Sequence, residues 1–530
     1  MALRDRIPSE PGTTEHFEME QHATPVRLFE RVRIVTIQPA GYAHTAAFRE
    51  YASGLREAFA ALGSQVDAVD NQLLVGEGVN FVFGGHLLNP GTALPGNCII
   101  VNLEQMRAGW PAQFPHYIEL LRRHVVLDYS PSNIERIREL TGNPHVYRLK
   151  PGYVPNLTCI ESAAQQDVDV LFYGWINERR SKILDALREA GLVVQHLVGV
   201  YGAERDQWIA RSKILLNVHF YEDKIHEVIR TSFLLANRKA VVSECEPETE
   251  IDDDLRDALV AVPYAEIVQT CIALARDDAG RREVEQRGFE IFARRDQAAI
   301  LAAVLAQLSR PLPRRINLGS GKAYDPERLN IDIDPKWQPD ILGDLAHAAG
   351  LKRIFFSPKY GLTRLEAGQF DEIATMDVLE HVPDLVTFMT RCLELLRVGG
   401  AMRIGVPYDL SYGAWQDPTH VRAFNERSWL YYTEWHWYTG WTHARFDLAQ
   451  LKMTLSPVGQ ALKAHGMPDE EIFRTPRAVD DMQVVLVKRM LTEPEAERAL
   501  AWLRGALRTA QSAGDGRERE RAGEGAPLLQ

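Results

Sequence analysis

The chain has 530 residues, of which 45% are hydrophobic and 25% are charged, and its formal net charge is −12. This length suggests three or four folding units, and the composition is that of an ordinary globular protein. The negative charge argues against a general nucleic-acid binder, because no excess of cations is present to neutralise phosphates. A local basic patch is not excluded by this argument.

The ends of the chain and its cysteines give further bounds. Residues 1–30 are rich in charge and lack the apolar core of a signal peptide, so we expect a mobile leader. Residues 491–508 are expected to form a terminal helix, and the Gly- and charge-rich residues 509–530 a disordered tail. The sequence contains no apolar run near the roughly 18 residues that a bilayer span needs. The five cysteines are scattered without a CxxC pair, which fits a reducing compartment and assigns no metal ligands. We therefore expect a cytoplasmic location without a transmembrane segment.

Short apolar strands alternate with helical stretches over residues 31–155. The run "VRIVTIQ" at 32–38 is followed by the amphipathic stretch "TAAFREYASGLREAFAALG". Further strand candidates are "NFVFGG", "NCIIVNLEQ" and "HVVLDYS". Such alternation predicts a parallel sheet covered by helices on both faces.

A second series of the same kind occupies residues 156–308. It opens with "DVDVLFYGW" and continues with "VVQHLVGVYG", "KILLNVHFY" and "AVVSE". Two consecutive series predict two Rossmann-like halves with a cleft between them, where the carboxyl ends of the strands point. The Pro/Gly-rich "LKPGYVPNLT" suits a hinge between the halves, and "SRPLPRR" at 309–315 suits a linker after them.

The second half contains candidate ligands for an anion. Gly174 opens a loop at a strand end, and the helix that follows begins with "ERRSK". Backbone amides at Gly174 together with Arg179, Arg180 and Lys182 could neutralise a diphosphate. The alternative is that these cations are only the solvated start of a helix.

These two halves resemble the GT-B glycosyltransferases across residues 31–308. The stretch "DVLFYGWINERRSKIL" is similar to the loop that meets a donor diphosphate, and "LLNVHFYEDKIHEVIRTSFLLANRKAVVSE" to the late donor-binding segment. The resemblance implies a nucleotide-sugar donor, with Glu227 and Arg230 on one helix face. One departure concerns the glutamate that holds the donor ribose in many such enzymes, because Ser232 or Phe233 stands there. Either Glu227 substitutes from one turn earlier, or donor binding is altered or lost.

A third unit begins with "RRINLGSGKAYDPERLNIDID" at Arg314. A buried strand runs into the turn Gly319-Ser320-Gly321, where the backbone can approach a ligand closely. The next strand ends at Asp332, whose carboxylate could accept hydrogen bonds from both ribose hydroxyls of a nucleotide-type cofactor. No third glycine is spaced for a pyrophosphate, which argues against a dinucleotide.

Two later segments extend this pattern: "FDEIATMDVLEHV" at 370–382 and "LLRVGGAMRIGVPYD" at 395–409. With "NLGSGK" and "NIDID" they resemble, in order, the motifs of class I S-adenosylmethionine-dependent methyltransferases over roughly 313–460. The resemblance implies a Rossmann-like methyltransferase domain over 316–490 that binds S-adenosylmethionine. The implied cofactor-binding residues are Gly319, Ser320, Gly321, Asp332, Asp344 and Asp377. The alternative is an α/β domain whose pocket no longer binds.

The segment after the fifth strand should cover this site and supply the methyl acceptor's base. An imidazole with a pKa near 6.5 suits removal of a hydroxyl proton, and His420 in "DPTH" is the candidate. Asp417 would orient His420 or help to hold a divalent cation, whose involvement stays open. The alternative is structural: Asp417 caps a helix and His420 hydrogen-bonds the loop.

Three functions remain after these observations. The first is a bifunctional enzyme that transfers a sugar and O-methylates a glycan or glycosylated product. The second is a methyltransferase whose first two units only bind the acceptor, and the third is a non-enzymatic nucleotide-binding scaffold. The sequence identifies neither the sugar, the acceptor nor the oligomeric state. Bacterial surface polysaccharide tailoring is a setting suggested by analogy alone.

Overall fold

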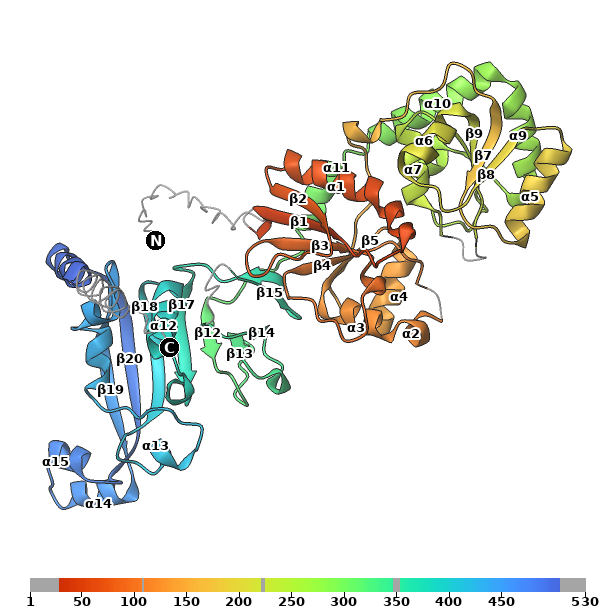
Figure 1. Cartoon of the computed structure of the whole chain (residues 1–530). Coiled ribbons are helices and arrows are strands. Elements are labelled where there is room, and N and C mark those ends of the chain that lie inside the picture. Colours follow the sequence, from red (N-terminus) through yellow and green to blue (C-terminus); the bar gives the residue numbers. More distant parts are fainter. Residues whose placement is uncertain (1–27, 107–108, 221–224, 347–352, 506–530) are drawn as a thin grey trace, which may run out of the picture.

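The computed structural model describes residues 28–106, 109–220, 225–346 and 353–505. Three α/β units follow one another along the chain, and the first lies between the other two (Figure 1). Residues 493–505 are helical, within the predicted terminal helix. The predicted tail and residues 1–27 of the predicted leader lie outside the described residues.

The first unit contains a six-stranded parallel sheet of order β2-β1-β3-β4-β5-β6. Helix α1 covers one face of the sheet and α3 and α4 cover the other, as the alternating pattern predicted (Figure 1). Their apolar side chains pack on the strands. The elements are β1 (Arg31–Thr36), α1 (Arg49–Ala61), β2 (Gln65–Asp70), β3 (Val79–Phe83), β4 (Cys98–Asn102), α2 (Trp110–Gln113), α3 (Pro115–Arg123), β5 (Val125–Asp128), α4 (Pro131–Thr141) and β6 (Val146–Arg148).

The second unit contains a five-stranded parallel sheet of order β11-β10-β9-β7-β8. Its two faces are covered by α5 and α9 on one side and by α6, α7, α8 and α10 on the other. The elements are β7 (Val168–Tyr173), α5 (Glu178–Glu189), β8 (Val194–Leu197), α6 (Gly202–Arg211), β9 (Ser212–Asn217), α7 (Val228–Ala236), β10 (Ala240–Glu244), α8 (Asp253–Ala258), β11 (Val260–Val262), α9 (Ile267–Arg276) and α10 (Asp278–Ala293).

The chain returns to the first unit before the third begins. Helix α11 (Gln297–Leu305) packs beside α1, and its residues Leu301, Val304 and Leu305 belong to the first unit's core (Figure 1). The predicted second half ends at residue 308, but its last helix packs in the core of the first unit. The predicted boundary therefore differs from the boundary between the two cores. Its sequence, apolar on all sides, gave no indication of which half it would cover.

The third unit contains a seven-stranded sheet of order β14-β13-β12-β17-β18-β20-β19. Its first five strands in chain order are parallel and follow the order 3-2-1-4-5 of a Rossmann-like sheet, while β20 runs antiparallel between β18 and β19. The elements are β12 (Arg315–Leu318), β13 (Leu329–Asp332), β14 (Ile341–Leu342), β17 (Phe370–Met376), α12 (Leu385–Leu395), β18 (Leu396–Pro407), α13 (Gly413–Gln416), β19 (Ala444–Leu455), α14 (Pro457–Ala464), α15 (Asp469–Arg474) and β20 (Val479–Met490).

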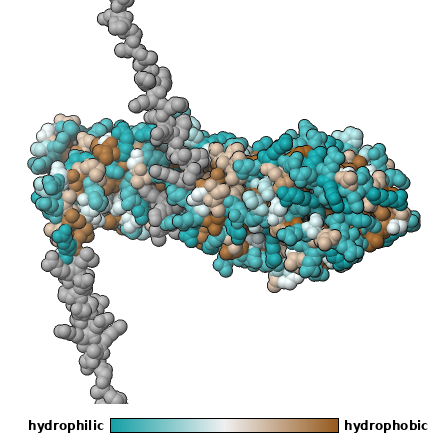
Figure 2. Space-filling model, turned by 90° about the horizontal axis from the view of Figure 1, so that it is seen from above, coloured by the Kyte–Doolittle hydropathy of each residue, from teal (hydrophilic) through white to brown (hydrophobic). Residues whose placement is uncertain are grey.

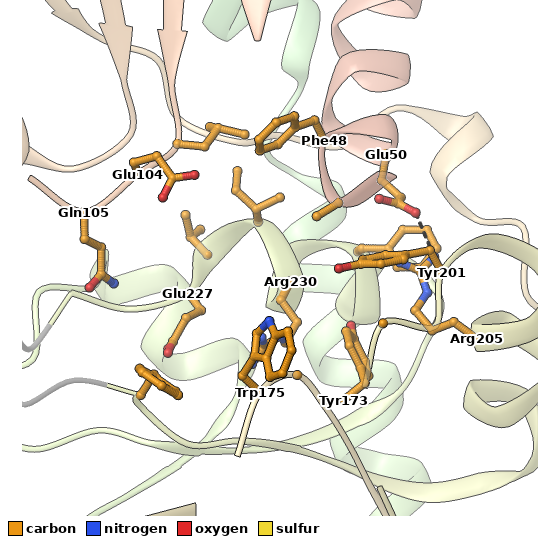
Figure 3. Close-up of a pocket in the computed structure, with 18 of the residues that line it drawn as sticks. Phe48, Glu50, Glu104, Gln105, Tyr173, Trp175, Tyr201, Arg205, Glu227 and Arg230 are labelled. Atoms are coloured by element: carbon orange, nitrogen blue, oxygen red, sulfur yellow. Dashed lines mark hydrogen bonds and ion pairs between the residues drawn. The ribbon is translucent and has the colours of Figure 1, made fainter. Parts of the chain in front are cut away.

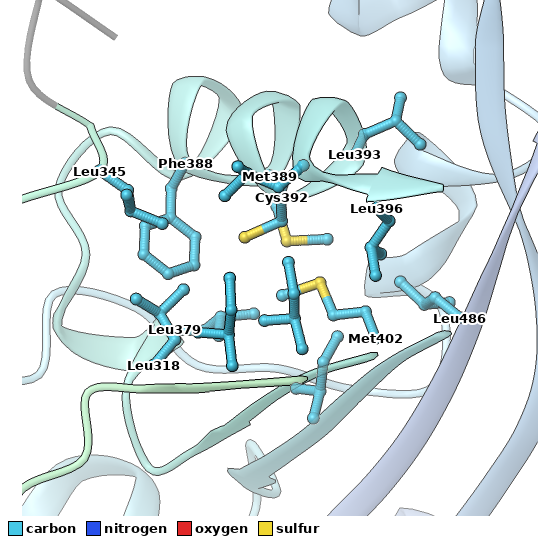
Figure 4. Close-up of a cluster of buried hydrophobic side chains, with 14 of the residues drawn as sticks. Leu318, Leu345, Leu379, Phe388, Met389, Cys392, Leu393, Leu396, Met402 and Leu486 are labelled. Carbon is cyan, nitrogen blue, oxygen red and sulfur yellow. The ribbon is translucent and has the colours of Figure 1, made fainter. Parts of the chain in front are cut away.

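Helix α12 closes the core of the third unit over the sheet (Figure 4). Phe388, Met389 and Cys392 point from the helix onto Leu318 and Met402 of the strands, and all five are buried. Burial of each large apolar side chain stabilises the fold by about 1.5–3 kcal/mol. This packing fixes the ends of β12 and β17, which carry the predicted cofactor residues.

A hairpin of the third unit is buried in the first unit. Strands β15 (Ile354–Ser357) and β16 (Gly361–Arg364) place Ile354 and Leu362 in the first unit's core. His145 Nε2 lies 2.9 Å from the carbonyl oxygen of Pro358 in the hairpin turn. The predicted linker at 309–315 is therefore followed by an anchoring contact, and the third unit is not tethered by the linker alone.

Hydrophilic residues predominate on the face of the molecule seen in Figure 2, with small separate hydrophobic patches. Among the described residues, no helix combines the length and the apolar character needed to cross a membrane.

Candidate functional site

A cavity of about 480 Å³ lies between the first two units. The carboxyl ends of β7 and β8 and the start of α7 form one wall, and the start of α1 and the loop after β4 form the other. Figure 3 shows side chains from both walls, among them Phe48, Glu50, Glu104, Gln105, Tyr173, Trp175, Glu227 and Arg230. The predicted cleft at the strand ends of two Rossmann-like halves is thus present.

Gly174 allows two arginines to approach the backbone at the end of β7. Its φ is +139°, a conformation that side-chain-bearing residues rarely adopt. A methyl group at Gly174 would come within 3.3 Å of Nη2 of Arg230 and 3.7 Å of Nη1 of Arg180. Arg180 is buried and donates to the carbonyl oxygens of Val218 and Trp175. Its charge therefore holds the ends of β9 and β7 together beside the cavity.

Glu227 is the carboxylate of this wall, directly before α7. It accepts hydrogen bonds from Asn217 Nδ2 at 3.0 Å and His219 Nδ1 at 2.9 Å, and Arg180 Nη2 lies 3.5 Å away. Burial alone would raise the pKa of Glu227, but the hydrogen bond and charge of His219, followed by the charge of Arg230, hold that pKa below its usual value. Glu227 is therefore an anion at the cavity, directly before the helix on which the ribose-binding glutamate was expected.

Arg230, one turn into α7, donates to Oδ1 of Asn217 at 3.0 Å. Its guanidinium also lies 5.3 Å from the ring centre of Tyr173. Four of the residues predicted for the nucleotide-sugar site therefore line one cavity: Gly174, Arg180, Glu227 and Arg230.

Arg179 and Lys182, the other two predicted ligands, do not line the cavity. Arg179 forms a bidentate ion pair with the buried Glu244 and lies over the ring of Tyr264. Lys182 pairs with Glu178 at 2.8 Å on the exposed side of α5. Adjacent helical residues point about 100° apart, so the basic run could not direct all three cations to one ligand.

Several cavity residues were not identified from the sequence. Trp175 follows Gly174 directly and is 61% exposed, which makes its ring available to a ligand. The sequence "YGW", in which an aromatic residue directly follows the glycine at the strand end, is a local signal for it. Tyr201 also lines the cavity, and its hydroxyl lies 2.8 Å from Nδ1 of His44 in the first unit, but no local pattern could reveal a pair 157 residues apart.

In the third unit the strand order reverses between β12 and β17, the place at which open α/β sheets bind ligands. A methyl group at Gly319, whose φ is +69°, would overlap the side chain of Val378 in the loop after β17. Ser320 is buried, and its hydroxyl has no hydrogen-bond partner within the described part of the chain. Asp332 accepts from the amides of Gly321 at 2.8 Å and Asp334 at 2.9 Å. The structure therefore brings the glycine turn and the predicted ribose carboxylate together.

The last two predicted cofactor residues, Asp344 and Asp377, are both exposed at strand ends. Asp344 accepts from the amide of Ala346 at 2.8 Å, which accounts for its position without a ligand. Asp377 has a φ of +55°, a strained conformation for a residue with a side chain. Such strain is concentrated at functional sites.

The predicted pairing of His420 with Asp417 differs from the structure. His420 Nδ1 lies 3.0 Å from the carbonyl oxygen of Ala414, so Asp417 does not orient this ring. Asp417 instead accepts from the amide and hydroxyl of Thr419 at 2.8 and 2.7 Å. The Asp417 carboxylate therefore stabilises the turn at Thr419 rather than the His420 ring.

Comparisons with known proteins find partial relatives, and no protein-family model matches the chain. Two uncharacterized proteins of Acanthamoeba polyphaga mimivirus are 26% identical over 181 residues and 29% identical over 157 residues. These matches cover 33% and 28% of the chain. The chain spans only 55% and 20% of the length of these two relatives.

Among solved structures, the chain is similar to WaaG, a glycosyltransferase involved in lipopolysaccharide biosynthesis. The alignment covers 52% of this chain and 99% of that one at 12% identity, with a TM-score of 0.36. It is also similar to HepE of Anabaena in complex with UDP and glucose, over 52% of this chain and 98% of that one, at 10% identity and a TM-score of 0.36.

Proposed function

We propose that the first two units form a glycosyltransferase that binds a nucleotide-sugar in the cavity between them. The observation that carries this proposal is the convergence of Gly174, Arg230 and Glu227 at the carboxyl end of β7 and the start of α7. The guanidinium of Arg230 can form charged hydrogen bonds to phosphate oxygens. Gly174 allows a ligand to approach the backbone, and the free amides at the start of a helix favour an anion such as a diphosphate.

The other cavity residues fit the rest of such a donor. Glu227, held ionised by His219 and Asn217, offers carboxylate oxygens to ribose hydroxyls. Trp175 presents an exposed ring on which a base or sugar can stack. In transfer, Arg230 would stabilise the charge that develops on the leaving diphosphate, and the acceptor would enter from the wall of the first unit.

The test is a titration of the full chain with uridine, guanosine, adenosine and thymidine diphosphates and their glucose conjugates, followed by tryptophan fluorescence. We expect one of them to bind in the micromolar range. Binding should be followed by release of free sugar, because such donors are slowly hydrolysed without an acceptor. A chain that binds none of them below millimolar concentration would favour the alternative function, an acceptor-binding module.

A second activity, methyl transfer from S-adenosylmethionine, is proposed for the third unit. It is supported by the 3-2-1-4-5 strand order, with the glycine turn and Asp332 at the reversal point. A glycine turn allows a ligand to approach the backbone closely, and the Asp332 carboxylate suits ribose hydroxyls. The acceptor would be a hydroxyl of a glycan or glycosylated product.

Calorimetry of the full chain with S-adenosylmethionine and with S-adenosylhomocysteine tests this activity. Micromolar binding of both supports it. Binding of neither would leave the third unit as a structural domain, without affecting the result for the first two units.

A further inference from the structure

Three side chains of the third unit, from the segments after β17 and α13, lie close together. Glu380 and His381 belong to the short helix η8 (Leu379–His381) after β17, and His420 follows α13. One carboxylate oxygen and one nitrogen from each ring all lie within 4.8 Å of one another. The amide of Val421 donates to the carbonyl oxygen of Glu380 at 2.8 Å, which fixes the two segments side by side.

The Glu380 carboxylate is buried. Its residue is 1% exposed, and neither oxygen has a hydrogen-bond partner within the described residues. Burying an ionised carboxylate in this way is costly unless a cation or donors compensate it. The rings of His381 and His420 are its neighbours, with centres 4.6 Å apart.

Both imidazoles form a hydrogen bond through Nδ1. His420 Nδ1 is 3.0 Å from the Ala414 carbonyl oxygen, which can only accept, so this nitrogen carries the proton. His381 Nδ1 is 3.0 Å from the hydroxyl of Thr419, and that hydroxyl donates its own proton to Asp417 at 2.7 Å. Each ring therefore donates through Nδ1 and keeps the lone pair of Nε2 for another partner. An outer hydrogen bond of this kind is usual for histidines that bind metals.

We propose that Glu380, His381 and His420 bind a divalent transition-metal cation. Two imidazoles and one carboxylate suit zinc, manganese or iron(II), and three protein ligands leave coordination positions open. From the sequence, the cysteines indicated no zinc site and only Asp417 was considered as a partner for a divalent cation, so none of these three residues was predicted to be a metal ligand. The motif "DVLEHV" contains Glu380 and His381, and the third proposed ligand, His420, is 39 residues beyond His381.

The consequence for catalysis rests on the proposed methyl transfer. The open positions would bind the acceptor hydroxyl and lower its pKa, so that its proton is lost to solvent. The oxygen would then bond to the methyl carbon while the carbon–sulfur bond breaks and its electron pair stays on sulfur. In this arrangement His420 is a ligand rather than the base predicted from the sequence.

The metal is tested on the full chain after chelation and dialysis, without a methyl donor or a sugar, so the result is independent of both proposed activities. Cobalt(II) is titrated and followed by its visible absorption, and zinc and manganese by calorimetry. We expect one equivalent to bind at micromolar concentration or tighter. A folded wild-type chain that binds none of the three metals below 100 µM would overturn the proposal.

Substitutions then place the metal in the chain. Glu380→Gln and His420→Asn should each weaken binding at least 100-fold, and Thr419→Val, at an exposed residue, by about 10- to 100-fold. The control is His465→Gln, because His465 makes the same kind of Nδ1 contact, 2.7 Å from the carbonyl oxygen of Ala461, on the exposed helix α14. Equal affinity in Thr419→Val and wild type, or equal losses in the control, would place the metal elsewhere.

Discussion

Glu50 and Arg205 form an ion pair across the cleft, with Oε1 of Glu50 2.7 Å from Nη2 of Arg205 (Figure 3). Glu50 belongs to α1 of the first unit and Arg205 to α6 of the second. The Arg205 side chain is 5% exposed and the Glu50 side chain 18%. The pair therefore fixes how the two walls of the cavity face each other.

Replacing Arg205 should leave the partly buried carboxylate of Glu50 without this ion-pair partner. We expect Arg205→Met to lower the free energy of unfolding by about 3 kcal/mol and to increase the radius of gyration as the cleft opens. Urea unfolding and small-angle scattering measure these two effects. Arg211→Gln is the control, because Arg211 pairs with Asp167 on the exposed surface of the same helix and should change neither. An unchanged radius in Arg205→Met would mean that other contacts set the angle between the units.

Arg230 provides the sharpest test of the donor site. Arg230→Gln should weaken nucleoside diphosphate binding to the full chain by roughly 10- to 100-fold, since a hydrogen bond to a charged group contributes about 1.5–3 kcal/mol. Lys182→Gln removes a cation from the same unit but outside the cavity, and should leave affinity unchanged. Fluorescence of Trp175 reports both. If the two variants bind nucleoside diphosphates equally well, Arg230 does not contact the ligand and α7 is not part of the donor site.

The sequence was informative where function follows a strand end and uninformative where it depends on tertiary pairing. Gly174 and Glu227 could be identified because a glycine after a strand and an acid before a helix are local signals. Arg179 was assigned wrongly to the cavity because the local sequence does not show that its partner is Glu244, 65 residues away. The Glu50–Arg205 pair, 155 residues apart, and the hairpin at 354–364 have no local signature either.

The pair of His219 and Glu227 should make stability depend on pH. Burial alone would lower the pKa of His219, but its hydrogen bond to Glu227 raises that pKa above the ordinary 6.5, while the pKa of Glu227 is held below the ordinary 4.5. The histidine contribution is complete below pH 6.5 and is lost as the pH rises through the raised pKa. The glutamate contribution is complete above pH 4.5 and is lost on acidification.

Comparison of wild type with His219→Asn isolates this effect. The difference in the free energy of unfolding should be largest between pH 4.5 and 6.5 and should shrink on either side. Urea unfolding across the pH range measures it. A difference that does not vary with pH would mean that the ring contributes packing only.

The hairpin contact predicts that the third unit depends on the first. A methyl group at Gly96 would lie 3.1 Å from the amide nitrogen of Phe356 in the hairpin. Gly96→Val should therefore displace the hairpin and destabilise the chain by about 1–3 kcal/mol. Gly109→Val is the control, because a Cβ there meets nothing within 4 Å. Limited proteolysis between residues 309 and 364 should be faster only in Gly96→Val.

The glycine turn of the third unit is tested by a pair of glycines with nearly equal backbone angles. Gly319 has a φ of +69° and Gly368 a φ of +73°, so alanine introduces similar strain at each, about 1 kcal/mol. Only at Gly319 would the methyl group overlap Val378; at Gly368 it would meet nothing within 4 Å. We expect Gly319→Ala to reduce S-adenosylmethionine affinity at least tenfold and Gly368→Ala to leave it unchanged. Calorimetry on both variants, with thermal unfolding as a check of folding, separates the effect of displacing Val378 beside the turn from the effect of backbone strain. If Gly319→Ala binds as wild type does, the cofactor does not contact this turn, and the methyl-transfer proposal loses its main support.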